Sequence, residues 1–229
     1  MPGYAVETCT HRIGGVDFRL RGLADRRQHH DPKDEALLAG VPPSAWSHFG
    51  VLWPAGLALA QAMSVLPVKG LRILELGCGL GLASLVLKRR GADITASDHH
   101  PLAGRFLRHN EGLNRLSPID FHCGPWEATD DSLGRFDLLI GADLLYERGQ
   151  GPALGGFVGR HARPVAGVML ADAGRGYSAP FTEALRRLGF GKTAERVWTD
   201  GQWPPGRGGK IHTYGRPDPR ATSAPRDPA

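Results

Sequence analysis

The sequence predicts an α/β fold in which a doubly wound, mostly parallel sheet carries helices on both faces. Three observations support this fold class: several short runs are continuously apolar, turn residues follow each run, and a helical pattern follows each turn. A strand that is apolar throughout is buried on both faces, which is typical of a parallel sheet between helix layers. The 229 residues fit one domain with modest extensions.

The expected elements alternate along the chain. The core strands are expected at LRILEL (71–76), ADITASD (92–98), FDLLIGAD (136–143) and GVMLAD (167–172). Helical periodicity predicts helices at 52–66, 81–90, 102–116, 152–161 and 179–188. Two alternating segments, AERVWTD and KIHTYGR, flank the Gly/Pro-rich loop 201–209 and predict an antiparallel pair at one sheet edge.

The two ends of the chain fall outside this alternation. The stretch ETCTHRIGGVDFRLRGL predicts a β-hairpin around Gly14 and Gly15, within an N-terminal extension of residues 1–45. HHDPKDEALLAG then indicates an irregular connection. Residues 216–229 are rich in proline, alanine and charge, so we expect a disordered tail after a domain of residues 46–215.

Composition excludes several classes of protein. The chain has 28 basic and 23 acidic residues, and the surplus is scattered, so no nucleic-acid partner is expected. Cys9, Cys78 and Cys123 lie far apart without a C-x-x-C pair, which indicates neither a disulfide framework nor a zinc site. The N-terminus lacks the apolar core of a signal peptide, and no window approaches the roughly 18 apolar residues of a membrane span. We expect a cytoplasmic monomer that contacts no membrane.

A glycine-rich turn, LELGCGLGLASL, joins the first core strand to a helix through Gly77, Gly79 and Gly81. Glycine allows positive φ and lets a ligand approach the backbone closely. The spacing is G-x-G-x-G rather than the dinucleotide pattern G-x-G-x-x-G, and Glu75 stands two residues before the first glycine. An acid there would repel a pyrophosphate, but it suits the ammonium group of an amino acid.

Asp98 ends the second core strand, seventeen residues after Gly81. Its carboxylate can accept hydrogen bonds from both hydroxyls of a ribose. The turn and the acid together favour a nucleoside with an amino-acid tail, a description that S-adenosyl-L-methionine meets. The alternative is a plain tight β-to-α connection, which the order of strand, turn, helix and acid makes less favoured.

Four further stretches complete the pattern: VLWPAGLALA (51–60), RHNEGLN (108–114), GPW (124–126) and GADLLYE (141–147). With them, residues 46–215 resemble a seven-β-strand S-adenosylmethionine-dependent methyltransferase. More narrowly, they resemble methyltransferase family 16, which holds protein-lysine methyltransferases and nicotinamide N-methylase-like proteins. The resemblance implies a Rossmann-like fold with a mostly parallel seven-stranded sheet and an antiparallel edge strand.

The resemblance also implies roles for matching residues. Trp53 would help to close the cofactor pocket, Trp126 would lie near the adenine, and Ala142 would touch the cofactor. Both tryptophans have an alternative as ordinary core aromatics. No metal is expected, because the pairs His29–His30 and His99–His100 lack a third ligand, although His99 could pack beside the adenine. The expected cofactor-binding residues are Trp53, Glu75, Gly77, Cys78, Gly79, Gly81, Asp98, His99, Trp126 and Ala142.

Asp143 and Tyr146 are the expected catalytic residues. Asp143 ends the expected core strand FDLLIGAD (136–143), at the edge where open α/β sheets bind ligands. A carboxylate there orients an incoming amine and stabilises the positive charge that develops on it. It also favours the ammonium form, so it is not assigned as a strong general base, and desolvation or proton loss to water must supply the neutral amine. Tyr146 would hold the loop or form a wall of the amine channel. Alternatively, Asp143 caps the next helix and Tyr146 is a partly buried aromatic.

Two stretches of the sequence bear on the class of substrate. Leu144 and Leu145 stand where amino-nucleobase methyltransferases carry prolines, which counts against a nucleobase. The stretch LADAGRGY (170–177) resembles an Asp-Pro-Gly-Arg stretch of the family branch that methylates the β subunit of electron-transfer flavoprotein, so Asp172 and Arg175 either contact substrate or form a surface turn. The main expectation is N-methylation of an accessible lysine in a protein substrate. The alternatives are N-methylation of a small heteroaromatic or amine metabolite, and a non-catalytic binding protein.

Overall fold

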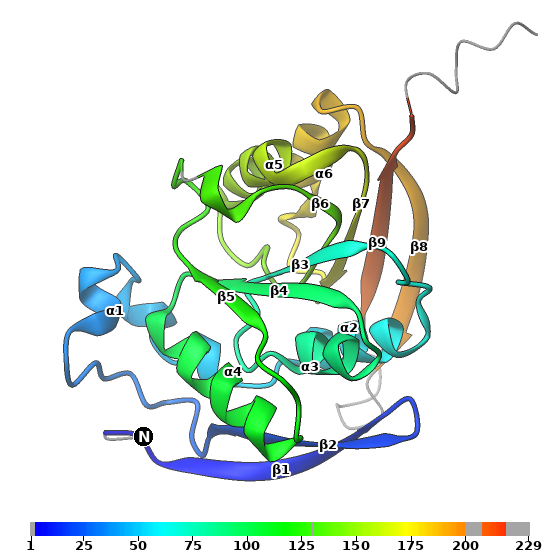
Figure 1. Cartoon of the computed structure of the whole chain (residues 1–229). Coiled ribbons are helices and arrows are strands. Elements are labelled where there is room, and N and C mark those ends of the chain that lie inside the picture. The colour runs from blue at the N-terminus through cyan, green and yellow to red at the C-terminus, as the bar shows by residue number, and fades with distance from the viewer. Residues whose placement is uncertain (1–2, 130, 200–207, 219–229) are drawn as a thin grey trace, which may run out of the picture.

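A computed structural model describes residues 3–129, 131–199 and 208–218. Its centre is a seven-stranded sheet with the order β5-β4-β3-β6-β7-β9-β8 (Figure 1). Strands β5, β4, β3, β6 and β7 pair in parallel, whereas β9 pairs antiparallel with both β7 and β8. The strands are β3 Arg72–Leu76, β4 Asp93–Asp98, β5 Asp120–Cys123, β6 Phe136–Ala142, β7 Ala162–Asp172, β8 Gly191–Thr199 and β9 Gly208–Arg216. The predicted fold class is confirmed.

Helices cover both faces of the sheet, with α2, α3 and α4 on one side and α5 and α6 on the other (Figure 1). Alternation along the strands explains the two layers: Ile73 packs into the core beneath α2 to α4, and its neighbour Leu74 packs into the core beneath α5 and α6. The helices are α2 Pro54–Val65, α3 Leu82–Arg89, α4 Pro101–Leu113, α5 Gln150–His161 and α6 Ser178–Arg187. None of the helices in the described ranges is both long enough and apolar enough to span a membrane.

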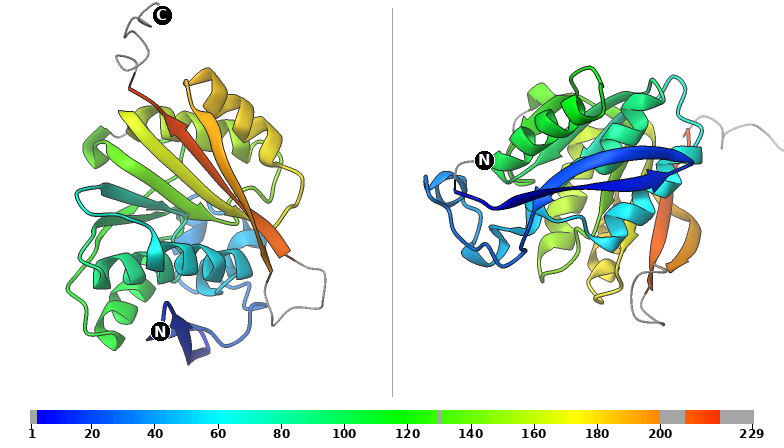
Figure 2. Two further views of the ribbon diagram at one scale, coloured as in Figure 1. Left: turned by 90° about the vertical axis from the view of Figure 1, so that its right-hand side faces the viewer. Right: turned by 90° about the horizontal axis from the view of Figure 1, so that it is seen from below.

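The N-terminal hairpin is confirmed, with β1 Val6–Ile13 and β2 Val16–Leu23 joined at Gly14 and Gly15. It packs along α2 to α4, so the extension shares the core of the domain (Figure 2). The segment that follows contains a four-residue helix, α1 Glu35–Leu38, where only an irregular connection was expected. The carboxylate of Asp31 explains this turn, because it accepts hydrogen bonds from three backbone N–H groups of α1.

Asn110 of α4 and Asn114, the C-cap residue of the same helix, attach the hairpin to the domain. The side-chain oxygen of Asn114 accepts from Arg19 N–H at 2.9 Å and its amide donates to Arg19 O at 2.7 Å. Asn110 makes the same two contacts with Arg21, at 2.8 and 3.2 Å. Both asparagines are buried. They satisfy the free edge of β2 as a neighbouring strand would.

Three expectations differ from the structure in detail. Strand β7 begins at Ala162, five residues before the expected 167. The short strand β5 was not located by its own pattern, and Trp126 lies beyond its last residue, Cys123. The expected tail includes Arg216, which ends β9, while residues 219–229 and 200–207 lie outside the described residues.

Candidate active site

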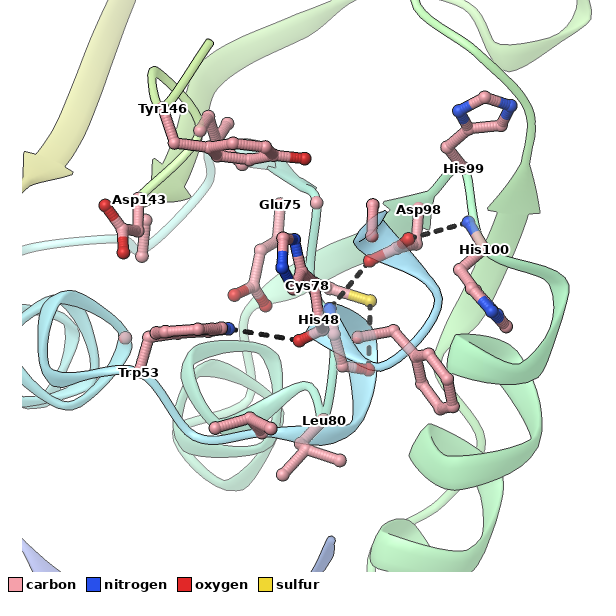
Figure 3. A pocket seen from close by; sticks show the side chains of 18 of the residues that line it. His48, Trp53, Glu75, Cys78, Leu80, Asp98, His99, His100, Asp143 and Tyr146 are labelled. Atoms are coloured by element: carbon pink, nitrogen blue, oxygen red, sulfur yellow. Dashed lines mark hydrogen bonds between the residues drawn. The ribbon is translucent and has the colours of Figure 1, made fainter. Parts of the chain in front are cut away.

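One cavity of about 300 Å³ opens at the carboxyl ends of the parallel strands, beside the point where the strand order reverses between β3 and β6 (Figure 3). This is where open α/β sheets bind ligands, and the volume lies at the lower end of the range for small-molecule sites. All twelve site residues expected from the sequence line it: Trp53, Glu75, Gly77, Cys78, Gly79, Gly81, Asp98, His99, Trp126, Ala142, Asp143 and Tyr146.

The glycine turn between β3 and α3 forms the floor of the cavity. Gly77 and Gly79 have φ of +57° and +53°, which side chains rarely adopt. A Cβ on Gly79 would lie 2.9 Å from the backbone oxygen of Phe49, and one on Gly77 would lie 2.5 Å from Cδ2 of Leu144. The turn therefore requires glycine at both positions, and it presents bare backbone to a ligand.

Asp98 holds this turn from the end of β4. Its Oδ2 accepts a hydrogen bond from Gly79 N–H at 2.8 Å, and its Oδ1 accepts one from His100 N–H at 2.8 Å. Burial raises the pKa of Asp98, and the two backbone hydrogen bonds oppose that rise. Each oxygen keeps a lone pair, so the carboxylate can accept two further hydrogen bonds from a ligand.

Glu75 lies behind the turn, fully enclosed between β3 and α3. Its Oε2 accepts hydrogen bonds from the backbone N–H of Ser84, at 2.8 Å, and from the Ser84 hydroxyl. Burial raises the pKa of Glu75 to about 7, and the bonds from Ser84 limit the rise. Because both bonds go to Oε2, Oε1 is the oxygen left for a cationic or hydrogen-bonding ligand.

The rings of Trp53, His48 and Tyr146 form one wall of the cavity. Trp53, just before α2, donates its indole N–H to the backbone oxygen of His48 at 3.0 Å. The His48 ring stands edge-on to both Trp53 and Tyr146, with centroids 5.6 and 5.5 Å apart. Burial lowers the pKa of His48, so the imidazole is neutral at neutral pH and the wall is weakly polar and uncharged.

Tyr146 completes this wall from the loop after β6. The side-chain oxygen of Gln150 accepts the backbone N–H groups of Tyr146 and Glu147, both at 2.8 Å, and so ties the loop to the start of α5. Burial raises the pKa of Tyr146, which keeps the phenol protonated. In Figure 3 the hydroxyl of Tyr146 points into the cavity.

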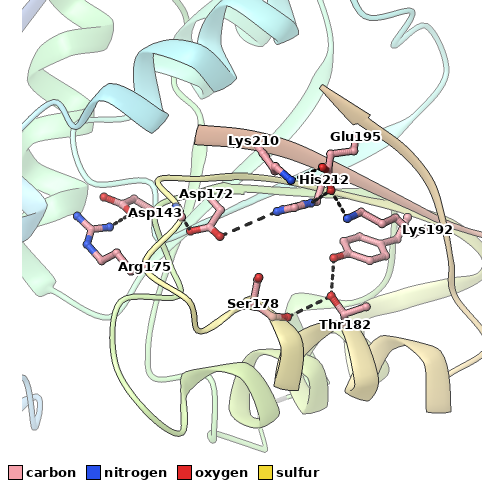
Figure 4. A network of polar contacts seen from close by, with 11 residues as sticks. Asp143, Asp172, Arg175, Ser178, Thr182, Lys192, Glu195, Lys210 and His212 are labelled. Carbon is pink, nitrogen blue, oxygen red and sulfur yellow. Dashed lines mark hydrogen bonds and ion pairs between the residues drawn. The ribbon is translucent and has the colours of Figure 1, made fainter. Parts of the chain in front are cut away.

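Asp143 stands at the rim, directly after β6. It is a non-glycine residue with φ of +54°, and its N–H donates to Ala171 O at 2.8 Å, which extends the pairing of β6 with β7 by one residue. The helix that follows begins at Gln150 with Gly149 at its N-cap, so Asp143 does not cap it and that alternative is wrong. Its carboxylate forms an ion pair with Arg175 of the β7–α6 loop (Figure 4).

Comparison with known proteins shows the family of the chain. A family model described as lysine methyltransferase matches residues 44–175. The chain belongs to the lysine methyltransferase family. A Xenopus laevis protein named electron transfer flavoprotein beta subunit lysine methyltransferase is 30% identical over 209 residues, which cover 80% of this methyltransferase and 79% of that protein. The match to the rat protein of the same name spans 43% of its length.

Two further matches are a second protein named as a lysine methyltransferase and a solved structure. The Danio rerio protein N-lysine methyltransferase METTL21A is 33% identical over 120 residues, which cover 48% of this chain and 55% of that protein. The solved structure of the Thermus thermophilus 16S rRNA N2 G1207 methyltransferase, in complex with AdoMet and guanosine, aligns with a TM-score of 0.61. At 19% identity over 93% of this chain and 51% of that one, this second likeness shows the fold alone.

Among the remaining expected residues, Cys78 and Trp126 make hydrogen bonds through their backbone, whereas His99 makes a contact through its ring. Cys78 N–H donates to Ser97 O at 2.9 Å, and burial raises the pKa of its thiol well above the usual value. A ring nitrogen of His99 lies 2.7 Å from Ala39 O. The backbone oxygen of Trp126 accepts from Arg160. No group of His, Cys, Asp and Glu within the described ranges is arranged to hold a metal ion.

Sequence reasoning missed several residues that the methyltransferase fold brings to the cavity. His48 and Phe49 belong to a 3-10 turn, His48–Gly50, where no periodic signal marked a site. His100 stacks on Phe49 with centroids 4.0 Å apart, and burial lowers its pKa to about 4. Their position shortly before Trp53, or directly after Asp98, was the available signal. Arg175 was considered, but its pairing with Asp143 was not.

Proposed function

We propose that the protein is an S-adenosylmethionine-dependent N-methyltransferase whose substrate is a lysine side chain of another protein. One observation carries the proposal: Glu75, Asp98 and Asp143, which stand at the carboxyl ends of three different strands, line the same cavity beside a bare glycine turn. Membership of the lysine methyltransferase family supports the same reaction class.

The residues fit the cofactor. Gly77 and Gly79 line the cavity with bare backbone, because neither position has room for a side chain of its own. We assign Asp98 to the two ribose hydroxyls and the free oxygen of Glu75 to the amino-acid ammonium group. When bound, S-adenosylmethionine supplies a sulfonium methyl group: a new N–CH3 bond forms as the S–CH3 bond breaks, and the electron pair of the broken bond stays on sulfur.

The amine is proposed to enter between the three rings and Asp143. Trp53, His48 and Tyr146 present flat apolar faces that exclude water from a long aliphatic side chain. Asp143 lies at the rim, beside this passage, and can orient the nitrogen lone pair. A lysine has the length and the terminal amine that this arrangement suits.

The first acceptor to test is the electron-transfer flavoprotein β subunit of the source organism, because a relative is named for that substrate. The purified enzyme is incubated with radiolabelled S-adenosylmethionine and either this protein or a lysate of a strain that lacks the gene. Label on a lysine of a protein band is the expected result. Label in the low-mass fraction alone would assign a small amine or heteroaromatic substrate instead, and calorimetry without any cofactor affinity would indicate a non-catalytic protein.

The cytoplasmic location and the monomeric state predicted from the sequence stay predictions, and fractionation and light scattering test them.

A further inference from the structure

The cavity is strongly acidic. Five carboxylic residues line it: Glu75, Asp98, Glu127, Asp143 and Glu147. None of the described residues that line it is lysine or arginine. Such a surface attracts an ammonium group, but it also stabilises the protonated form, which has no lone pair with which to attack a methyl group. A lysine methyltransferase with this lining therefore needs a positive charge that offsets part of the attraction.

Arg175 supplies a positive charge at the required place. Its guanidinium forms an ion pair with Oδ1 of Asp143, whose side chain is only 7% exposed, whereas the arginine side chain is 38% exposed. The guanidinium of Arg175 points toward the carboxylate of Asp143 (Figure 4). Only one carboxylate oxygen is engaged, so Oδ2 remains available for a hydrogen bond from the substrate nitrogen.

The fold builds this pair from two adjacent strand ends. Asp143 follows β6 and Asp172 ends β7, and Ala142 pairs with Ala171 in the sheet. Beyond β7 the chain turns back, and Oδ1 of Asp172 accepts a hydrogen bond from Gly174 N–H at 3.1 Å. This turn directs Arg175 across the rim toward Asp143.

Other titratable groups surround the pair. His48 interacts electrostatically with both members of the pair, and also with Glu147 and His29. Behind it, Asp172 lies 4.0 Å from a ring nitrogen of His212. His212 in turn contacts Glu195, which pairs with Lys192 and Lys210. Burial lowers the pKa of His48 and of His212, so these two histidines are neutral at neutral pH. Of these groups, Arg175 is the cation in direct contact with Asp143.

We propose that Arg175 is a positioning residue for methyl transfer: by offsetting part of the negative charge of Asp143, it allows a lysine held at this carboxylate to lose its proton and become a nucleophile. The inference rests on the proposed function. The proton leaves to water, and the lone pair that it frees becomes the attacking group. Without Arg175, the full charge of Asp143 would hold the lysine in its ammonium form.

The test is the pH dependence of kcat, which reports groups in the enzyme–substrate complex. Wild type, Arg175→Gln and Arg175→Lys are assayed at a saturating concentration of the acceptor protein. The acceptor is the electron-transfer flavoprotein β subunit or the protein labelled in the lysate, and it is purified from the deletion strain. Arg175→Gln should raise the pH of half-maximal kcat by about one unit. The rate should recover at high pH. Arg175→Lys should restore the wild-type midpoint, because it restores the charge.

A matched control exists at the opposite ends of the same strands, where Arg163 of β7 pairs with Asp137 of β6 at 2.9 Å. Arg163→Gln removes an arginine from an equivalent pair outside the cavity and should leave the midpoint unchanged. An unaltered midpoint in Arg175→Gln, whatever its rate, overturns the inference, and so does a lysine variant that behaves like the glutamine variant. A wild-type enzyme that labels no protein contradicts the proposed function itself and removes the basis of the inference with it.

Discussion

Glu75 of β3 and Ser84 of α3 are joined by two hydrogen bonds, although nine residues separate them, and both bonds end on the same carboxylate oxygen. The contact lies directly behind the glycine turn, so it fixes the helix start relative to the strand end. The same two hydrogen bonds hold the Glu75 carboxyl group in a buried position. An ammonium group of a ligand beside it would stabilise the negative charge of Glu75.

Glu75 should make stability depend on pH. Its folded pKa of about 7 lies above the unfolded value near 4.5, so the protonated form favours folding. This stabilisation is complete below the unfolded pKa and is lost as the pH rises through the folded one. Wild type should therefore lose on the order of 3 kcal/mol relative to Glu75→Gln between pH 4 and 8. Urea unfolding across that range measures the difference, and parallel curves for the two proteins would contradict the expectation.

Asp98→Ala should weaken cofactor binding and destabilise the turn. The substitution leaves the N–H groups of Gly79 and His100 without their acceptor, and each unsatisfied buried group costs about 1–3 kcal/mol. Calorimetric titration with S-adenosylmethionine measures the affinity, and thermal unfolding measures the stability. A variant that binds the cofactor as wild type does would remove Asp98 from the ribose site.

Asp143→Asn should separate catalysis from cofactor binding. The amide keeps the size of the side chain but cannot stabilise a developing positive charge, so kcat should fall about 10²–10³-fold. Cofactor affinity should change little. Asp137→Asn, at the other end of β6, is the control for effects of the substitution on the strand. Equal turnover in wild type and Asp143→Asn would exclude the assigned role.

Tyr146 should contribute through its ring rather than its hydroxyl. The ring packs edge-on against His48, and such pairs contribute about 0.5–1.5 kcal/mol. Tyr146→Phe keeps the ring and should retain most of the activity, whereas Tyr146→Ala should lose about tenfold in kcat/KM. If both variants lose activity equally, the hydroxyl itself takes part in the reaction.

Asn114→Ala should loosen the hairpin without changing the site. It removes both hydrogen bonds to Arg19 of β2, which should cost about 1–3 kcal/mol of unfolding free energy. Hydrogen exchange at the Arg19 amide should accelerate, and S-adenosylmethionine affinity should stay within twofold. A loss of affinity comparable to that of Asp98→Ala would instead make the hairpin part of the cofactor site.

The sequence predicted most of the sheet because the signals of its strands are local. Strands β3, β4 and β6 are apolar runs beside turn residues, and their expected bounds agree with the structure to within one residue. Strand β5 was not predicted, because it has only four residues and two of them, Asp120 and His122, are polar. The expected site residues all line the cavity because strand ends of a parallel sheet meet at one edge.

By itself, then, the sequence determined the alternation of elements, the glycine turn and the acids at the strand ends, since each depends on a few consecutive residues. Only the tertiary structure decided that Arg175 contacts Asp143, that His48 stands between Trp53 and Tyr146, and that Asn110 and Asn114 bond to β2. The physical reason is that an ion pair, a ring contact or a side-chain hydrogen bond forms within a few ångströms of space. No local periodicity records which distant segments the fold brings that close.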